Sequence, residues 1–115
     1  MYSKELLKGT IEALILQTLE SRGRLYGYEI AKQIKEISDE KIMISEGSLY
    51  PILHKLERDG VLEAEKEKIG RRVRRYYKLT SKGKPFAAAA TAELQDFLQT
   101  VQHIIQQLQQ PPQTI

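Results

Sequence analysis

The chain carries one β-hairpin signal, and the patterns on either side of it are helical. Residues 61–68 alternate loosely between apolar and polar side chains, and residues 74–80 are rich in aromatic and β-branched types. Gly70 lies in the short basic stretch between them, where a residue that tolerates positive φ favours a tight turn. Three amphipathic segments precede this hairpin and one long segment follows it. That order predicts a mainly α fold with a small β-hairpin, namely a winged helix-turn-helix with a long C-terminal helix.

Apolar residues recur at helical spacing in the three segments before the hairpin. The pattern predicts helices over residues 5–20, about 27–37 and about 46–59. In such folds the second helix of the helix-turn-helix pair enters the DNA major groove, and here that is the helix over 46–59. Tyr28, near the start of the helix before it, is a candidate DNA contact.

The helix over 46–59 presents one apolar and one polar face. Ser45 or Ser48 is its candidate N-cap, and Pro51 favours the later start because proline costs about 3 kcal/mol in a helix interior. At about 100° per residue, the apolar residues that point inward are Leu49, Ile52, Leu53 and Leu56. The candidate DNA contacts on the exposed face and its edge are Ser48, Tyr50, Pro51, His54, Lys55 and Arg58.

The positive charge is concentrated in one segment. The net charge of the chain is +3, but residues 66–84 hold nine Lys and Arg against one Glu, whereas residues 1–65 and 85–115 are each net negative. A concentrated basic patch indicates a polyanion as partner. The alternative is a hairpin tip that charge merely keeps solvated.

The hairpin supplies the candidate wing contacts to phosphates or to the minor groove, which are Arg71, Arg72 and Arg74. Arg75 has the same strand parity as Tyr77, so one of these arginines is expected to lean back over the core instead.

The last long segment predicts a helix that runs from the cap pair Thr80-Ser81 to about Gln109. Its apolar seam follows heptad spacing and consists of Leu94, Phe97, Leu98, Val101, Ile104, Ile105 and Leu108. A second copy of the chain would bury this seam, and the alternative is that it folds back on the first helix of its own chain. The expected division is a DNA-binding domain over 1–80, a dimerisation helix over 81–110 and a frayed tail over 111–115.

Several function classes lack support in the sequence. The chain contains no cysteine, and its two histidines, His54 and His103, lie far apart, so neither a metal site nor a cofactor is expected. No nucleophile–base set or glycine-rich phosphate loop is present, which argues against an enzyme. No segment reaches the roughly 20 apolar residues that span a bilayer, and the expected location is the cytoplasm.

Five short motifs follow one another through the winged part of the chain. They are Lys8-Gly9-Thr10 with the leucines that follow, Leu25-Tyr26-Gly27-Tyr28-Glu29-Ile30, Gly47-Ser48-Leu49-Tyr50-Pro51-Ile52-Leu53-His54-Lys55-Leu56-Glu57 with Asp59-Gly60-Val61-Leu62, Gly70-Arg71-Arg72, and Arg75-Tyr76-Tyr77-Lys78-Leu79-Thr80. In this order and at this spacing they resemble the PadR family of bacterial transcriptional regulators. The single final helix resembles the short subfamily with one C-terminal dimerisation helix.

The resemblance implies a homodimeric repressor that binds a palindromic DNA operator and is released by a small-molecule effector, phenolic or hydrophobic. In the drug-sensing subgroup a tryptophan on the last helix helps to form a flat aromatic pore at the dimer centre. This chain contains no tryptophan. The corresponding position is Leu94, with Phe97 one turn further, and these two are the candidate effector-binding residues. Pro85 and the alanine run over 87–90 also depart from the family pattern.

Two other binding functions are weighed against operator binding. A winged helix that binds a protein partner without reading DNA is the alternative, although such modules often lack a basic wing. RNA binding is disfavoured because the sequence indicates no exposed aromatic platform on which bases would stack.

Overall fold

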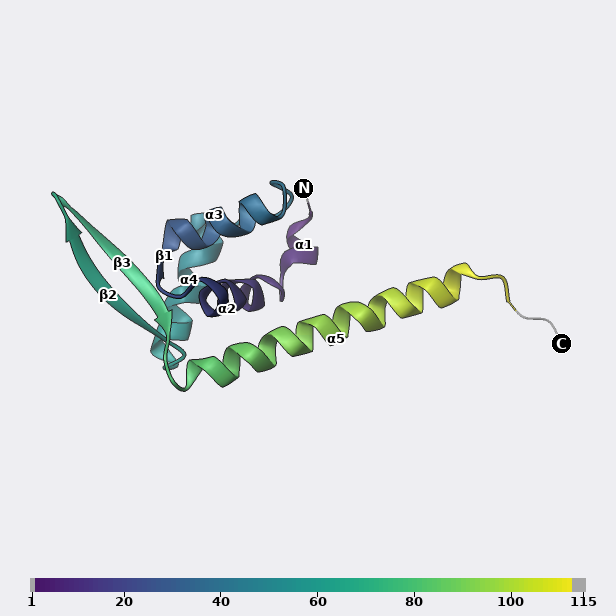
Figure 1. The fold of residues 1–115 in the computed structure, drawn as a ribbon. Coiled ribbons are helices and arrows are strands. Elements are labelled where there is room, and N and C mark those ends of the chain that lie inside the picture. The colour runs from purple at the N-terminus through teal and green to yellow at the C-terminus, as the bar shows by residue number, and fades with distance from the viewer. Residues whose placement is uncertain (1, 113–115) are drawn as a thin grey trace.

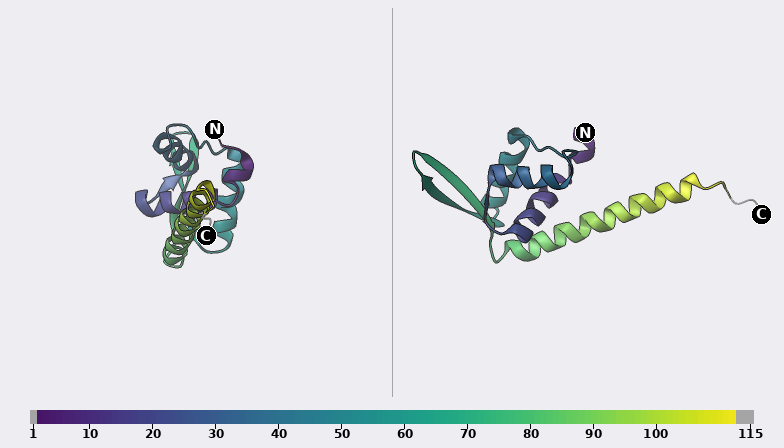
Figure 2. Two further views of the ribbon diagram at one scale, coloured as in Figure 1. Left: turned by 90° about the vertical axis from the view of Figure 1, so that its right-hand side faces the viewer. Right: turned by 45° about the horizontal axis from the view of Figure 1, so that its top comes forward.

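The computed structural model describes residues 2–112. Its elements are α1 (Lys4–Leu7), α2 (Ile11–Arg22), β1 (Leu25–Tyr26), α3 (Gly27–Ile37), α4 (Glu46–Arg58), β2 (Leu62–Ile69), β3 (Arg72–Leu79) and α5 (Gly83–Gln109). Helices α2, α3 and α4 form a body, the β2–β3 hairpin extends from one end of it, and α5 projects the other way (Figures 1 and 2). The mainly α winged helix-turn-helix is confirmed, whereas most of the tail expected over 111–115 lies outside the described residues.

The prediction of one helix over residues 5–20 is wrong, because the chain breaks at Gly9. α1 ends at Leu7, Lys8 has extended backbone angles, and Gly9 has a φ of +91°. α2 then begins at Ile11, and the Thr10 hydroxyl donates a hydrogen bond to the Leu7 carbonyl at 2.7 Å. Glycine costs about 1 kcal/mol relative to alanine inside a helix, so a break is least costly here.

Helix α4 starts earlier than Pro51 suggested. Ser45 is the N-cap of α4, and its hydroxyl accepts a hydrogen bond from the Ser48 N–H at 3.3 Å. Pro51 therefore lies in the second turn of the helix, where it leaves the Gly47 carbonyl without its helical donor. Gly47 is exposed, so its carbonyl is open to hydration and the early start is tolerated.

The sheet has three strands rather than the two expected, in the order β1-β3-β2, and all pairs are antiparallel. The added strand is β1, in which Leu25 pairs with Tyr77 and Tyr26 with Tyr76. The hairpin itself is confirmed: Ile69 pairs with Arg72, and Gly70 between them has a φ of +64°. Its positive φ at the first loop position is the one that a tight two-residue hairpin turn assigns to glycine.

The core lies where α2, α3 and α4 meet the base of the sheet. Its fully buried residues include Ile15, Leu16, Leu19, Ile30, Leu49, Leu53, Leu56, Leu62 and Tyr77. α5 joins this core at its first turn, where a side chain on Gly83 would overlap the Val61 carbonyl. The Thr80 hydroxyl accepts a hydrogen bond from the Gly83 N–H at 2.9 Å and donates one to the Gly60 carbonyl at 2.6 Å.

α5 changes character along its length of about 40 Å. Pro85 lies in the first turn and the helix continues without interruption through it. In the alanine run, Ala87 is fully buried against the core and Ala90 is half-buried, so these short side chains let α5 pack closely on α2. Beyond Val101 every described residue of α5 is exposed. No helix within residues 2–112 has the length and apolarity to cross a membrane.

Candidate nucleic-acid interface

Helix α4 has the two faces that its sequence predicts. Leu49, Leu53 and Leu56 are buried and Ile52 is half-buried. The candidate contacts Ser48, Pro51, His54, Lys55 and Arg58 are all exposed, and Tyr50 is half-buried. Among the described residues, His54 and Arg58 form no side-chain hydrogen bond or ion pair, so both are free to meet a ligand.

Tyr50 holds the two helices of the helix-turn-helix together. A Cβ on Gly27 would lie 2.8 Å from the Tyr50 hydroxyl oxygen, so the ring rests directly on the first turn of α3. A larger residue at Gly27 would require the Tyr50 ring to shift. Tyr50 therefore positions α4 against α3, and its hydroxyl end packs on Gly27.

The Lys55 side chain is exposed to solvent but also forms an ion pair with α2. Its ammonium nitrogen lies 3.3 Å from a carboxylate oxygen of Glu12 on α2. More than half of the Lys55 side chain is exposed, so the pair is a surface one that competition with a phosphate would break readily.

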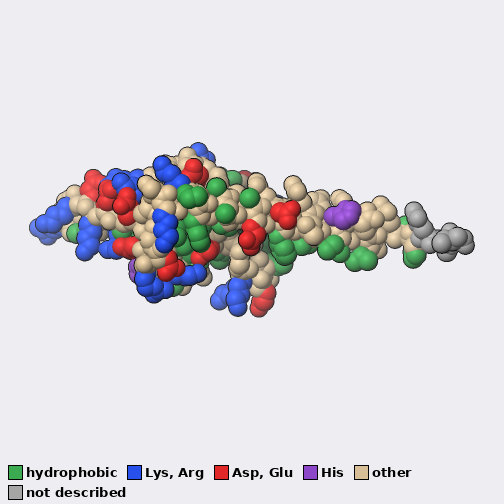
Figure 3. Space-filling view, turned by 90° about the horizontal axis from the view of Figure 1, so that it is seen from below, with side chains coloured by type: hydrophobic (Ala, Val, Ile, Leu, Met, Phe, Trp, Pro, Cys, Tyr) green, Lys and Arg blue, Asp and Glu red, His purple; other side chains and the backbone are tan. Residues whose placement is uncertain are grey.

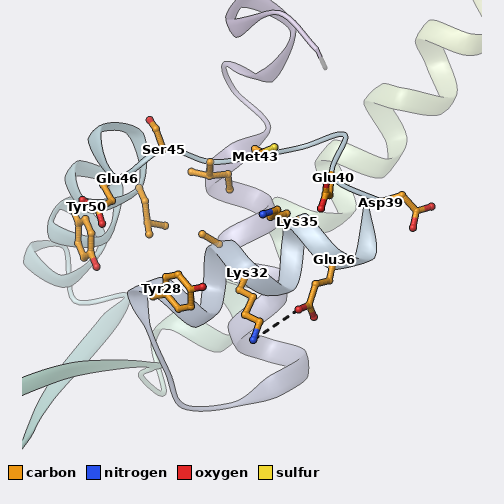
Figure 4. A pocket seen from close by; sticks show the side chains of 13 residues that line it. Tyr28, Lys32, Lys35, Glu36, Asp39, Glu40, Met43, Ser45, Glu46 and Tyr50 are labelled. Atoms are coloured by element: carbon orange, nitrogen blue, oxygen red, sulfur yellow. Dashed lines mark ion pairs between the residues drawn. The ribbon is translucent and has the colours of Figure 1, made fainter. Parts of the chain in front are cut away.

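A groove of about 820 Å³ separates α3 from the start of α4 (Figure 4). Tyr28, which is 61% exposed, and Tyr50 line one end of it, and Asp39 and Glu40 line the other. Lys32 is paired with Glu36 across 3.9 Å, and Glu46 adds a further carboxylate. The groove thus has more acidic than basic side chains, and it is a poor phosphate site.

One face of the hairpin, the closed face, has its charges neutralised by ion pairs within the chain. On β2, Glu63, Glu65 and Glu67 alternate along this face, where Lys78 lies 3.4 Å from Glu63 and 3.0 Å from Glu65. Arg24, just before β1, reaches Glu65 at 3.2 Å and Glu67 at 2.7 Å. The hydrogen bond from Lys78 lowers the pKa of Glu65, and the hydrogen bond to Glu67 raises the pKa of Arg24.

Aromatic rings extend this closed face. Tyr28, Tyr26 and Tyr76 form a row with ring centroids 6.1 and 5.6 Å apart. The Arg24 guanidinium lies 3.8 Å from the Tyr76 centroid, and that of Arg74 lies 4.5 Å from the Tyr26 centroid. Residue spacing does not predict this row, in which arginines cover one face of the Tyr26 and Tyr76 rings.

The other face and the tip of the hairpin carry the unpaired cations. Within residues 2–112, Lys66, Lys68, Arg71 and Arg72 form no ion pair, and all four are exposed. Figure 3 shows Lys and Arg side chains gathered at this end of the molecule. Sequence reasoning named Arg71 and Arg72 but not the two lysines. The alternation of β2 was the available signal, because it places its glutamates on one face and Lys66 and Lys68 on the other.

The two remaining wing arginines are engaged within the chain. Arg75 binds both carboxylate oxygens of Glu57 on α4, at 2.7 and 2.8 Å, so it is the arginine that leans back over the core. Arg74 is half-buried on Tyr26, so its side chain is less accessible than those of Arg71 and Arg72.

A second feature lies at the far end of the molecule, on α5. Most of the predicted seam is exposed, with Phe97 at 59%, Leu98 at 54% and Leu108 at 79%, and Ile104 and Ile105 at about half. Apolar side chains follow the projecting part of the helix in Figure 3. Leu94 and Val101 are half-buried. Leu94 and Phe97 line a groove of about 640 Å³ between α2 and α5, so the structure brings the two candidate effector residues to one site.

Residues that could hold a metal ion are not clustered. In the described part of the chain, no three His, Asp or Glu side chains are grouped closely enough for a metal site. The free groups are cations on α4 and the wing, together with apolar side chains on α5.

Comparison with known proteins accounts for this combination of features. The sequence profile of the "Transcriptional regulator PadR-like family" matches residues 15–89. The transcriptional regulator Rv3488 of Mycobacterium tuberculosis is 42% identical over 50 residues, which cover 44% of this chain and 47% of the relative.

Solved structures agree with that match. A transcriptional regulator from Clostridium thermocellum has a TM-score of 0.78 and 27% identity, covering 87% of this chain and 97% of its own. A PadR family regulator from Eggerthella lenta has a TM-score of 0.73 and 31% identity, covering 88% of this chain and 86% of its own. The chain therefore belongs to the PadR-like family, and it is a DNA-binding transcriptional regulator and not an enzyme.

Proposed function

We propose that the protein is a repressor that binds a palindromic operator as a homodimer and is released by a small-molecule effector. The observation that carries the proposal is the exposed apolar seam of α5, which no other part of the described chain covers. Monomeric proteins rarely leave a contiguous apolar surface of this kind in water. A second copy offers an identical seam with the same heptad spacing.

In the proposed complex, α4 lies in the major groove and the wing follows the adjacent backbone. The free side chains of His54 and Arg58, with Ser48 and Pro51 near the helix start, would face the base edges and phosphates. Arg71 and Arg72 would bind phosphates or enter the minor groove, and Lys66 and Lys68 would extend that contact along β2. A two-fold dimer would place its two α4 helices about 34–36 Å apart, which matches half-sites one helical turn apart.

The effector would occupy the groove between α2 and α5, next to Leu94 and Phe97. The groove is lined by apolar Phe86, Ala89 and Ala90, and also by Glu12, Glu93 and Asp96. These carboxylates would repel the carboxylate of a phenolic acid, so a neutral or cationic hydrophobic compound is favoured. A thermal-shift series with phenolic acids and with cationic aromatic compounds tests this, and stabilisation by the acids alone would contradict it.

The alternative, a winged module that binds a protein and not an operator, has less support, because four unpaired cations on the wing suit a phosphate backbone. The decisive test is a gel-shift titration with the DNA upstream of the protein's own gene at several salt concentrations. Tight binding that weakens steeply with salt, with two chains per duplex, is expected. No binding at low salt would contradict the proposal.

A further inference from the structure

The end of α4, the recognition helix of the proposed complex, is joined to the wing by an ion pair. Glu57 lies in the last turn of α4, and its two carboxylate oxygens accept hydrogen bonds from one terminal nitrogen of Arg75 on β3, at 2.7 and 2.8 Å. The two residues are 18 positions apart and belong to different elements, so the contact fixes one element against the other.

Among residues 2–112, Glu57 is the one carboxylate that forms an ion pair with Arg75. Its Nε is buried and makes no hydrogen bond, and its guanidinium lies 5.9 Å from the ring centroid of Tyr77. Tyr77 is fully buried and lies two residues further along the same face of β3. Lys66 is directly opposite on β2 and adds a like charge. Glu57 is therefore the group that holds Arg75 against α4.

This pair contributes little to the stability of the fold. The side chains of Arg75 and Glu57 are 40% and 31% exposed, and ion pairs with this much solvent contact stabilise proteins only weakly. A larger effect is expected on geometry. The tip of the hairpin is four residues from Arg75, or about 13 Å along the strand, so a rotation of about 10° at Arg75 displaces the tip by about 2 Å.

We propose that Glu57 and Arg75 are positioning residues, which set the direction of the wing relative to the recognition helix so that both reach the same DNA site. The inference rests on the proposed operator binding. It assigns Arg75 a different role from Arg71 and Arg72, since Arg75 acts through Glu57 and not through a phosphate.

Because Glu57 is negatively charged, the direction in which Glu57→Gln changes the affinity for DNA tests the proposal. If Glu57 were only a surface carboxylate near the DNA, Glu57→Gln would remove a repulsive charge and tighten binding. If Glu57 positions the wing, the same change releases Arg75 and weakens binding by about tenfold, the size of one lost contact.

The experiment measures affinity for a duplex that the wild-type protein selects from a random library, at fixed salt. The variants are Glu57→Gln, Arg75→Gln and the exchange Glu57→Arg with Arg75→Glu. Glu63→Gln is the matched control, because it makes the same charge change on the opposite face of the hairpin. The two Gln variants should lose about tenfold, the exchange should recover most of the loss, and the control should lose nothing. All variants should melt close to the wild type.

A double-mutant cycle separates positioning from a general weakening of α4. In a background that changes Lys66, Lys68, Arg71 and Arg72 to Ala, the wing has lost its unpaired cations, so Glu57→Gln should no longer weaken binding. Equal or tighter binding of Glu57→Gln in the wild-type background, or an undiminished loss in this four-alanine background, would overturn the inference. Absence of any duplex bound by the wild type would instead refute the operator binding on which it rests.

Discussion

The wing tip and the outer half of α5 are both exposed and without partners in the chain, but they differ in chemistry. The tip carries Arg71 and Arg72 with Lys66 and Lys68 beside it, all without ion pairs among the described residues. The outer half of α5 carries leucine, isoleucine and phenylalanine instead. Unpaired cations attract a polyanion, whereas an apolar seam is buried only by another apolar surface. The two ends therefore suit different partners, DNA at the tip and, as proposed above, a second copy at α5.

The difference predicts that salt acts on the two ends separately. At a higher salt concentration the counterions released on binding gain less entropy, which weakens the wing–phosphate contacts. Burial of the α5 seam depends on the hydrophobic effect and is not weakened by screening.

The largest effect is expected when the apolar end is made charged. Leu98→Asp with Ile105→Asp places carboxylates in the seam, and sedimentation should change from dimer to monomer. The affinity for the operator should fall about 100-fold or more, because two linked half-site contacts become two separate ones. Gln99→Asp with Gln106→Asp is the control, since these residues lie on the opposite side of α5. If the Leu98→Asp, Ile105→Asp variant were still a dimer, the seam would not be the surface that binds a second copy.

The next largest effect is expected at the tip. Arg71→Ala with Arg72→Ala should weaken DNA binding about 10- to 100-fold for all sequences, and should leave the dimer intact in sedimentation. The slope of log affinity against log salt should become shallower by about 0.9 for each phosphate contact removed. An unchanged slope would mean that these arginines do not meet phosphates.

The two faces of the hairpin provide a smaller, internal comparison. Lys66→Ala with Lys68→Ala removes unpaired cations and should weaken DNA binding several-fold. Lys78→Ala removes a cation that Glu63 and Glu65 already neutralise, and the affinity should change little. Binding titrations at one salt concentration compare the two. Equal losses would show that pairing with glutamate does not withdraw a cation from DNA.

The smallest effect is expected when low pH removes the stabilisation that ion pairs give to the closed face of the hairpin. Lys78 lowers the pKa of Glu65 below its usual range, so the pair stabilises the folded state above that range and the contribution is lost as pH falls through the lowered pKa. The difference in melting temperature between the wild type and Glu65→Gln should therefore shrink as pH falls from 7 to below 4. A difference that grew on acidification would contradict this assignment.

Local periodicity predicts most of the secondary structure of this chain. The two faces of α4, the hairpin turn at Gly70 and the helix that ends at Gln109 follow from residue spacing alone. Pro51 shows the limit of propensity: an exposed carbonyl at Gly47 lowers the cost that the sequence argument assigned to an interior proline.

Contacts between distant residues are what the sequence does not predict. β1 is only Leu25–Tyr26, and it is a strand because Tyr76 and Tyr77 pair with it. Arg24 closes one face of the wing through glutamates 41 and 43 residues away. Glu57 is one of several surface glutamates in the sequence, and its pairing with Arg75 depends on where the hairpin leaves α4.

The salt dependence of operator binding, measured together with the number of chains bound per duplex, tests the central claim most directly. The account predicts two chains per duplex and an affinity that falls steeply and linearly with salt on logarithmic axes, by less for the Arg71→Ala, Arg72→Ala variant. An affinity that does not change with salt, or one chain per duplex at saturation, would contradict it.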